Sequence, residues 1–158
     1  MRLSLRKGFS FGLTSAAITT LGMIVGLDSA LHSKLVVIGG IISIAIADAF
    51  SDALGIHISE ESENKHSHKE IWESTLATFI TKFVFALTFL IPILLFELST
   101  AIYVCLAWGL LMITGLSYYI AKRDKKDSFK VIGEHLVIAI VVIIITRYVG
   151  LWVGTFFG

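Results

Sequence analysis

Two aspartates lie inside an otherwise apolar stretch of the chain, and they are its strongest candidates for chemistry. Asp48 and Asp52 are four residues apart, so on a helix both point to the same side. Two carboxylates this close repel each other unless a proton, a cation or a basic side chain balances them. Hard oxygen ligands suit divalent cations such as Mg²⁺, Ca²⁺, Mn²⁺ and Fe²⁺. The spacing therefore predicts a site at which a metal ion and protons compete.

A structural interpretation of the two aspartates stands beside the chemical one. The apolar stretches also contain two basic residues, Lys82 and Arg147. An ionisable side chain inside a membrane is expensive and is usually paired or functional. Asp48 and Asp52 could therefore pair with either basic residue and hold a helical bundle together.

A second acidic group follows the aspartates along the chain. If the helix that carries Asp52 continues, Ser59 and Glu63 share its face, and Glu60 lies beside them. These oxygens could gather cations at the membrane surface and load them toward the aspartates. A solvated polar loop is the alternative.

Neutral ligands and small residues accompany the aspartates. Ser15, Thr19 and Met23 describe one face of the first apolar stretch, which could line a polar path or simply pack. The residues predicted to line that path are Ser15, Thr19, Met23, Ser51 and Ser59. Small residues let helices approach closely in lipid, and those predicted to pack in this way are Gly22, Gly26 and Gly55.

Composition indicates what must position these residues. The chain has 158 residues, of which 56% are hydrophobic and 16% charged, with a net charge of +1. It excludes a disordered tail and a nucleic-acid-binding domain, and the single cysteine excludes an internal disulfide. A membrane-spanning helix needs roughly 20 apolar residues. Five stretches meet that requirement, and the spans are predicted at about 9–27, 35–57, 74–96, 100–121 and 131–156, with a short cytosolic polar segment at 58–72.

Basic residues predict the orientation of the five spans. Lys and Arg are enriched in cytoplasmic loops. Those that lie outside the spans fall almost entirely before the first span, between the second and third, and between the fourth and fifth. All of these segments share one side of the membrane, so the N-terminus is predicted to be cytoplasmic and the C-terminus outside. Pro92 is expected to kink the third span.

Several strings of residues resemble the vacuolar iron transporter family, including its yeast calcium-cross-complementer relatives. Residues 11–27 read FGLTSAAITTLGMIVGL and resemble the first span of that family. Residues 51–59, SDALGIHIS, resemble the end of its second span. Pro92 and the string TRYVG at 146–150 also look similar. The resemblance extends over the whole chain and all five spans.

The resemblance implies a homodimer with a cation path between its subunits, lined by the first two spans. It implies export of Fe²⁺, and often Mn²⁺, from the cytosol in exchange for protons. The chain departs from the family at three positions, where Ser15 replaces an aspartate, Asp52 a methionine and Ile56 a glutamate. The family's long cytosolic metal-binding insertion is reduced here to segment 58–72. An all-oxygen site favours harder ions, so Mn²⁺, Ca²⁺ and Mg²⁺ join Fe²⁺ as candidate cargo.

The sequence thus predicts an all-α, five-span, homodimeric integral membrane protein that transports divalent cations. The metal ligands are predicted to be Asp48, Asp52, Glu60 and Glu63. No enzymatic activity and no cofactor are expected, since the chain has no nucleophile–base arrangement and no phosphate-binding loop. In a prokaryote the membrane would be the plasma membrane. The alternative is a scaffold or assembly protein that transports nothing and whose aspartates form structural pairs.

Overall fold

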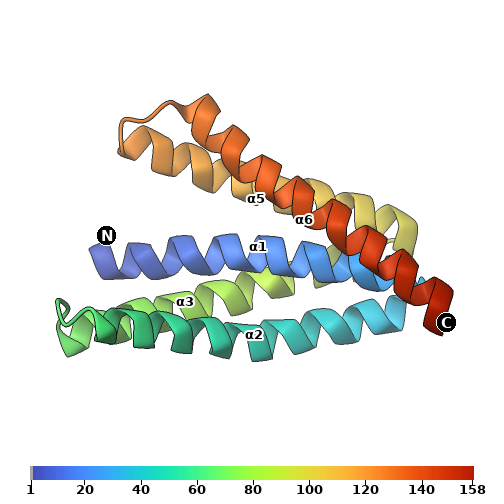
Figure 1. Ribbon diagram of the computed structural model, residues 1–158, viewed down its shortest axis with the longest axis horizontal. Helices are drawn as coiled ribbons and strands as arrows, with labels where there is room; N and C mark the ends of the chain where they lie inside the picture. The colour runs from blue at the N-terminus through green and yellow to red at the C-terminus, as the bar shows by residue number, and fades with distance from the viewer. Residues whose placement is uncertain (1) are drawn as a thin grey trace.

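The computed structural model describes residues 2–158, and helices make up nearly all of that range (Figure 1). Five helical segments are long and apolar enough to cross a membrane, the third of them being α3 and α4 together. The predicted all-α fold and the five spans are confirmed at this level. The helices are α1 (Leu3–Leu31), α2 (Lys34–Ser62), α3 (His68–Thr88), α4 (Leu90–Leu95), α5 (Leu98–Arg123) and α6 (Ser128–Phe157).

Polar side chains cap the first turns of α2, α3 and α6. The Ser33 hydroxyl accepts a hydrogen bond from the Val36 N–H at the start of α2. Ser67 and Glu70 form a reciprocal capping box at the start of α3, and the Asp127 carboxylate accepts from the first N–H groups of α6. Such caps satisfy N–H groups that have no partner within the helix. The helices extend past the apolar stretches, and α2 continues five residues beyond its predicted end at residue 57.

Proline interrupts the third span as predicted. α3 ends at Thr88, and α4 begins two residues later and contains Pro92. A proline has no N–H to donate to the carbonyl four residues earlier, and its ring crowds that carbonyl. Here that carbonyl belongs to Thr88. The backbone of Phe89 turns instead, donating to the Ala86 carbonyl oxygen at 3.2 Å.

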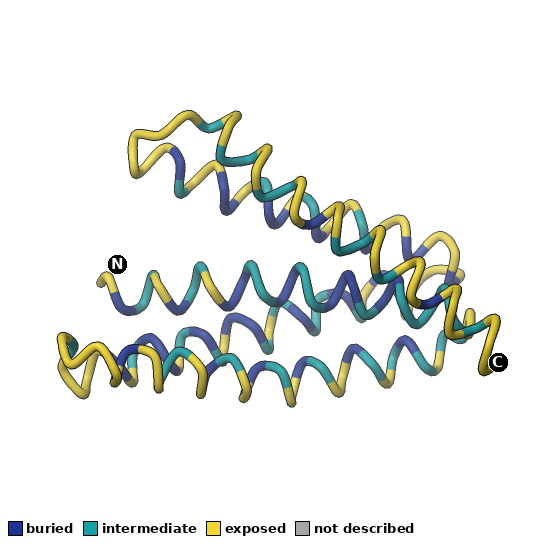
Figure 2. Tube along the Cα trace, viewed as in Figure 1, coloured by how far each residue is buried: buried dark blue, intermediate teal, exposed yellow. Residues whose placement is uncertain are grey.

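The central helix of the bundle is α1, which contacts α2, α3, α5 and α6. The α5–α6 hairpin lies against the C-terminal half of α1 (Figure 1). It diverges from α1 toward the end of the bundle where α1 begins. The two termini lie at opposite ends of the bundle. Buried residues line α1 along its length, whereas α6 is largely exposed (Figure 2).

Glycines let α1 approach its neighbours closely. A Cβ on Gly12 would lie 2.7 Å from the Thr78 carbonyl oxygen of α3. The predicted packing residues Gly22 and Gly26 lie against Thr146 of α6. Gly55, the third predicted packing residue, contacts no other helix of this chain, because nothing lies within 4 Å of the position a Cβ would take.

Candidate functional site

A buried lysine connects three helices at the middle of the bundle. Lys82 of α3 donates a hydrogen bond to the Ser15 hydroxyl of α1 at 2.7 Å. It donates another to the Asp52 carboxylate of α2. Its Nζ also lies 2.5 Å from Oδ2 of Asp48, one helical turn away. We call Lys82, Asp48, Asp52 and Ser15 the ion cluster.

Alanines make room for the ion cluster. Ala16, Ala45 and Ala86 pack together as a small buried cluster, one from each of α1, α2 and α3. Each stands within four residues of a member of the ion cluster on its own helix. Small side chains there bring the three helices close, so that the long Lys82 side chain fills the space between them. Lys82 is consequently only 1% exposed.

The charges of the ion cluster do not balance. Two carboxylates face one ammonium, and both carboxylates keep some access, with side chains 28% exposed for Asp48 and 19% for Asp52. The contact of Lys82 with Asp48 lacks hydrogen-bond geometry, and Oδ2 of Asp48 is buried without a hydrogen bond. With both acids ionised, one negative charge remains uncompensated. A proton or a cation at Asp48 would neutralise it.

An open groove between α1 and α2 leads to Asp48. Its volume is about 660 Å³. Three predicted path residues, Thr19, Met23 and Ser51, line it together with Asp48. The fourth, Ser15, lies on the inner side and binds Lys82. The groove therefore presents a carboxylate, hydroxyls and a thioether on one face of the bundle.

The chain by itself does not complete a metal site. Across residues 2–158, no three His, Cys, Asp or Glu side chains come close enough together to hold a metal ion. Asp48 and Asp52 supply two such groups, and their nearest charged neighbour is Lys82. Any further carboxylate, imidazole or thiolate ligand would have to come from a second chain.

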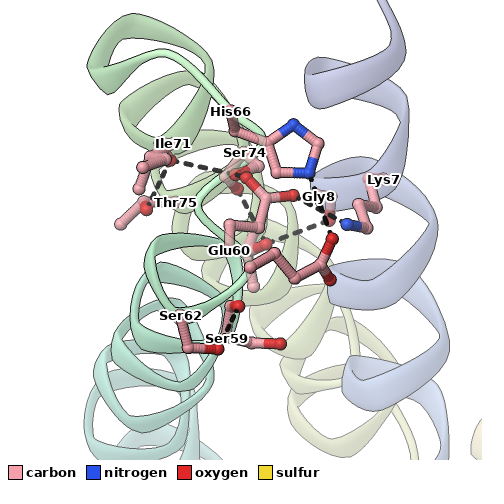
Figure 3. A network of polar contacts seen from close by, with 11 residues as sticks. Lys7, Gly8, Ser59, Glu60, Ser62, His66, Ile71, Ser74 and Thr75 are labelled. Atoms are coloured by element: carbon pink, nitrogen blue, oxygen red, sulfur yellow. Dashed lines mark hydrogen bonds and ion pairs between the residues drawn. The ribbon is translucent and has the colours of Figure 1, made fainter.

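The sequence predicts that Glu60 lies at an open cytosolic surface, but the structure shows that its side chain is buried. Its side chain is 2% exposed, and its Oε1 lies 3.1 Å from Nζ of Lys7 on α1. The Ser74 hydroxyl of α3 donates to the other carboxylate oxygen (Figure 3). Glu60 thus ties α1, α2 and α3 together near the N-terminal end. Sequence reasoning missed both partners, because neither Lys7 nor Ser74 is near Glu60 in the chain.

The other predicted loading residues lie just beyond Glu60 and apart from the groove. Glu63 caps the end of α2, and its Oε2 is 3.4 Å from Nε2 of His66. Ser59 is exposed, and its carbonyl oxygen accepts from the Ser62 hydroxyl at 2.8 Å. None of these residues lines the groove at Asp48.

Comparison with known proteins finds no match: no family model fits the chain, and no curated protein or solved structure is significantly similar to it. The class of the molecule therefore follows from its own architecture. It is a helical bundle with five segments capable of crossing a membrane and a charged cluster at its centre.

Proposed function

We propose that the chain is one subunit of a homodimeric membrane transporter that exchanges a divalent cation for protons. The observation that carries this proposal is the uncompensated carboxylate of the ion cluster. Asp48 and Asp52 face one lysine, and Asp48 borders the open groove. A charge left unbalanced inside a bilayer costs several kcal/mol, about 3 on insertion scales. A proton or a metal ion bound at Asp48 removes that cost, so the two compete for one place.

The lining of the groove supports a transition-metal cargo. Carboxylate and hydroxyl oxygens suit Mg²⁺, Ca²⁺ and Mn²⁺. Met23 adds a softer thioether to the same groove, which favours Fe²⁺ over the alkaline-earth ions. We therefore propose Fe²⁺ or Mn²⁺ as cargo, with Ca²⁺ and Mg²⁺ as the harder alternatives. The resemblance of residues 11–27 to the vacuolar iron transporter family points the same way.

Two copies are needed because one chain supplies only two carboxylates to the path. If the groove of each subunit faces its copy across a two-fold axis, the two Asp48–Asp52 pairs supply four carboxylates around a shared path. The basic segments at the N-terminal end of the bundle orient that end toward the cytoplasm. In this arrangement the cation leaves the cytosol and protons enter.

Transport by the purified chain in proteoliposomes tests the proposal. Wild-type protein should carry Mn²⁺ and Fe²⁺ inward or outward according to an imposed proton gradient. Asp48→Asn and Asp52→Asn should abolish the flux. Glu97→Gln is the matched control, since Glu97 is exposed at the start of α5 and has no ion pair among residues 2–158. Absence of metal flux from well-folded wild-type protein would overturn the proposal.

The ion pairs of Lys82 favour a second candidate, a scaffold or assembly protein that transports nothing. In that case Asp48, Asp52 and Lys82 only hold the helices together. Thermal unfolding separates the candidates, because a ligand that binds only the folded state raises its stability. Transport predicts that Mn²⁺ raises the melting temperature and that Asp52→Asn removes this effect. A scaffold predicts that Asp52→Asn lowers the melting temperature and that metal has no effect on either protein.

A further inference from the structure

A second polar cavity lies near the C-terminal end of the bundle, far along α1 from the N-terminal Glu60 contacts. It has a volume of about 210 Å³ and is enclosed by α1, α5 and α6. Asp28 and Arg147 both line it, and so do the hydroxyl-bearing residues Ser29, Ser99 and Tyr103. An acidic and a basic residue thus line one small space from two different helices.

The two charged groups in this cavity are not paired with each other. Arg147 has no ion-pair or side-chain hydrogen-bond partner among residues 2–158, although it lies within the span formed by α6. Oδ1 of Asp28 is 2.8 Å from Nδ1 of His32, one turn further along α1. Its other oxygen has no hydrogen bond to the described part of the chain. Arg147 therefore brings to the cavity a cation without a partner among the residues described, and Asp28 brings an anion with one oxygen free.

The chemistry that satisfies both groups at once is a small zwitterion. A guanidinium binds a phosphate through two parallel N–H donors. A carboxylate accepts hydrogen bonds from an ammonium, and the neighbouring hydroxyls can bind either charge. We propose that this cavity binds the headgroup of an amine-bearing phospholipid, phosphatidylethanolamine in type, with its phosphate at Arg147 and its ammonium at Asp28. The proposal does not rest on cation transport.

The position of the cavity favours a lipid over a dissolved molecule. Ser99 is the second residue of α5, and Asp28 lies in the last turn of α1. The cavity therefore lies near the ends of both helices, where they would meet the membrane surface. Phospholipid headgroups are found at that depth. Tyr103 is exposed, and tyrosines are enriched where membrane-spanning helices meet the headgroups. An acyl chain could leave the cavity along the exposed apolar surface of α6.

Native mass spectrometry of the purified chain with added lipids tests this site. Wild-type protein should bind phosphatidylethanolamine about tenfold more tightly than phosphatidylcholine, whose quaternary nitrogen offers Asp28 no hydrogen bond; one charged hydrogen bond accounts for such a ratio. Arg147→Gln should weaken both lipids by tenfold or more. Asp28→Asn should weaken phosphatidylcholine binding less than phosphatidylethanolamine binding, and so remove the preference for phosphatidylethanolamine. Arg123→Gln, in the last turn of α5 at the opposite end of the bundle, should change neither.

Two results would overturn the proposal. One is phosphatidylethanolamine binding that is the same in Arg147→Gln and in wild type. The other is stabilisation by soluble phosphoethanolamine that equals stabilisation by the lipid and also depends on Arg147, which would assign the cavity to a dissolved zwitterion. If Arg147→Gln does not fold, Arg147→Lys replaces it. This variant keeps the charge but loses the paired donors, and it should bind the lipid with intermediate affinity.

Discussion

At the scale of single residues, Lys82 dominates the interior of the bundle. It is among the largest fully buried side chains of the described residues, and it meets two carboxylates and a hydroxyl. Partners of this kind offset the desolvation of an ammonium only when all of them are present. Both candidate functions therefore require Lys82. They differ at Asp48, which binds a proton and a metal ion in turn in a transporter but only pairs with Lys82 in a scaffold.

Replacing the lysine should destabilise the protein. Lys82→Met leaves two carboxylates facing each other and the Ser15 hydroxyl without its donor, so the free energy of unfolding should fall by about 3 kcal/mol. Unfolding in mixed detergent micelles measures this. Lys130→Met, at an exposed position in the first turn of α6, is the control and should cost little.

The double variant Lys82→Met with Asp52→Asn provides the check on the cause. Removing one carboxylate relieves the repulsion, so part of the lost stability should return. If the double variant is less stable than Lys82→Met alone, the carboxylates do not repel each other in the folded protein, and the charge argument is wrong.

Glu60 should behave as a structural residue although the sequence suggests a metal ligand. Glu60→Gln keeps an oxygen for the Ser74 hydroxyl but loses the charge that faces Lys7, so stability should fall by about 1–2 kcal/mol. Metal flux in proteoliposomes should remain at the wild-type level. Glu61→Gln, at the exposed neighbouring position, is the matched control. If Glu60→Gln loses metal flux but keeps its stability, Glu60 is a residue of the cation path and not a structural residue.

At the scale of elements, the helices could be predicted and their contacts could not. Long apolar stretches define the five spans because a bilayer leaves no other way to pair the backbone, and Pro92 marks the break between α3 and α4. The helix ends depend on polar caps such as Ser67 with Glu70, which hydropathy does not detect. The choice of Lys82 rather than Arg147 as partner of the aspartates depends on which helix packs against α2. That packing is set by side-chain shape over the whole bundle.

Close packing of α1 on α3 should depend on Gly12. Gly12→Ala places a Cβ 2.7 Å from the Thr78 carbonyl oxygen, a backbone atom that cannot move aside. Overpacking of this kind costs about 1–3 kcal/mol. Gly133→Ala is the matched control, because nothing lies within 4 Å of its Cβ position. It should be neutral or stabilising by up to about 1 kcal/mol, since alanine favours helix. Unfolding of both variants measures the difference, and equal stabilities would contradict the close contact.

At the scale of the whole molecule, α2 has an unusual outer surface for a lipid-facing helix. Small residues recur at every fourth position on its exposed side, where most lipid-facing positions of α6 are large and apolar. Lipid gains little from small side chains, whereas another helix can approach them closely. The exposed small residues of α2 at this spacing are Gly39, Ser43, Ala47, Ser51, Gly55 and Ser59. Ser43, Ala47 and Ser51 border the groove that leads to Asp48, so a second copy seated there would cover the groove.

The proposed homodimer should therefore crosslink through α2. In a two-fold arrangement centred on this surface, Ser51 lies near its own copy, and a disulfide forms when the two Cα atoms are within about 7 Å. Ser51→Cys in membranes should give an oxidised dimer on a gel that reductant dissolves. Ile138→Cys, at a position that is also exposed but lies on α6, is the control and should stay monomeric. The native Cys105 is buried and should add no background. Equal crosslinking of both variants would indicate random collision in the membrane, and crosslinking only at Ile138→Cys would place the subunit contact on α6 and leave the groove facing lipid.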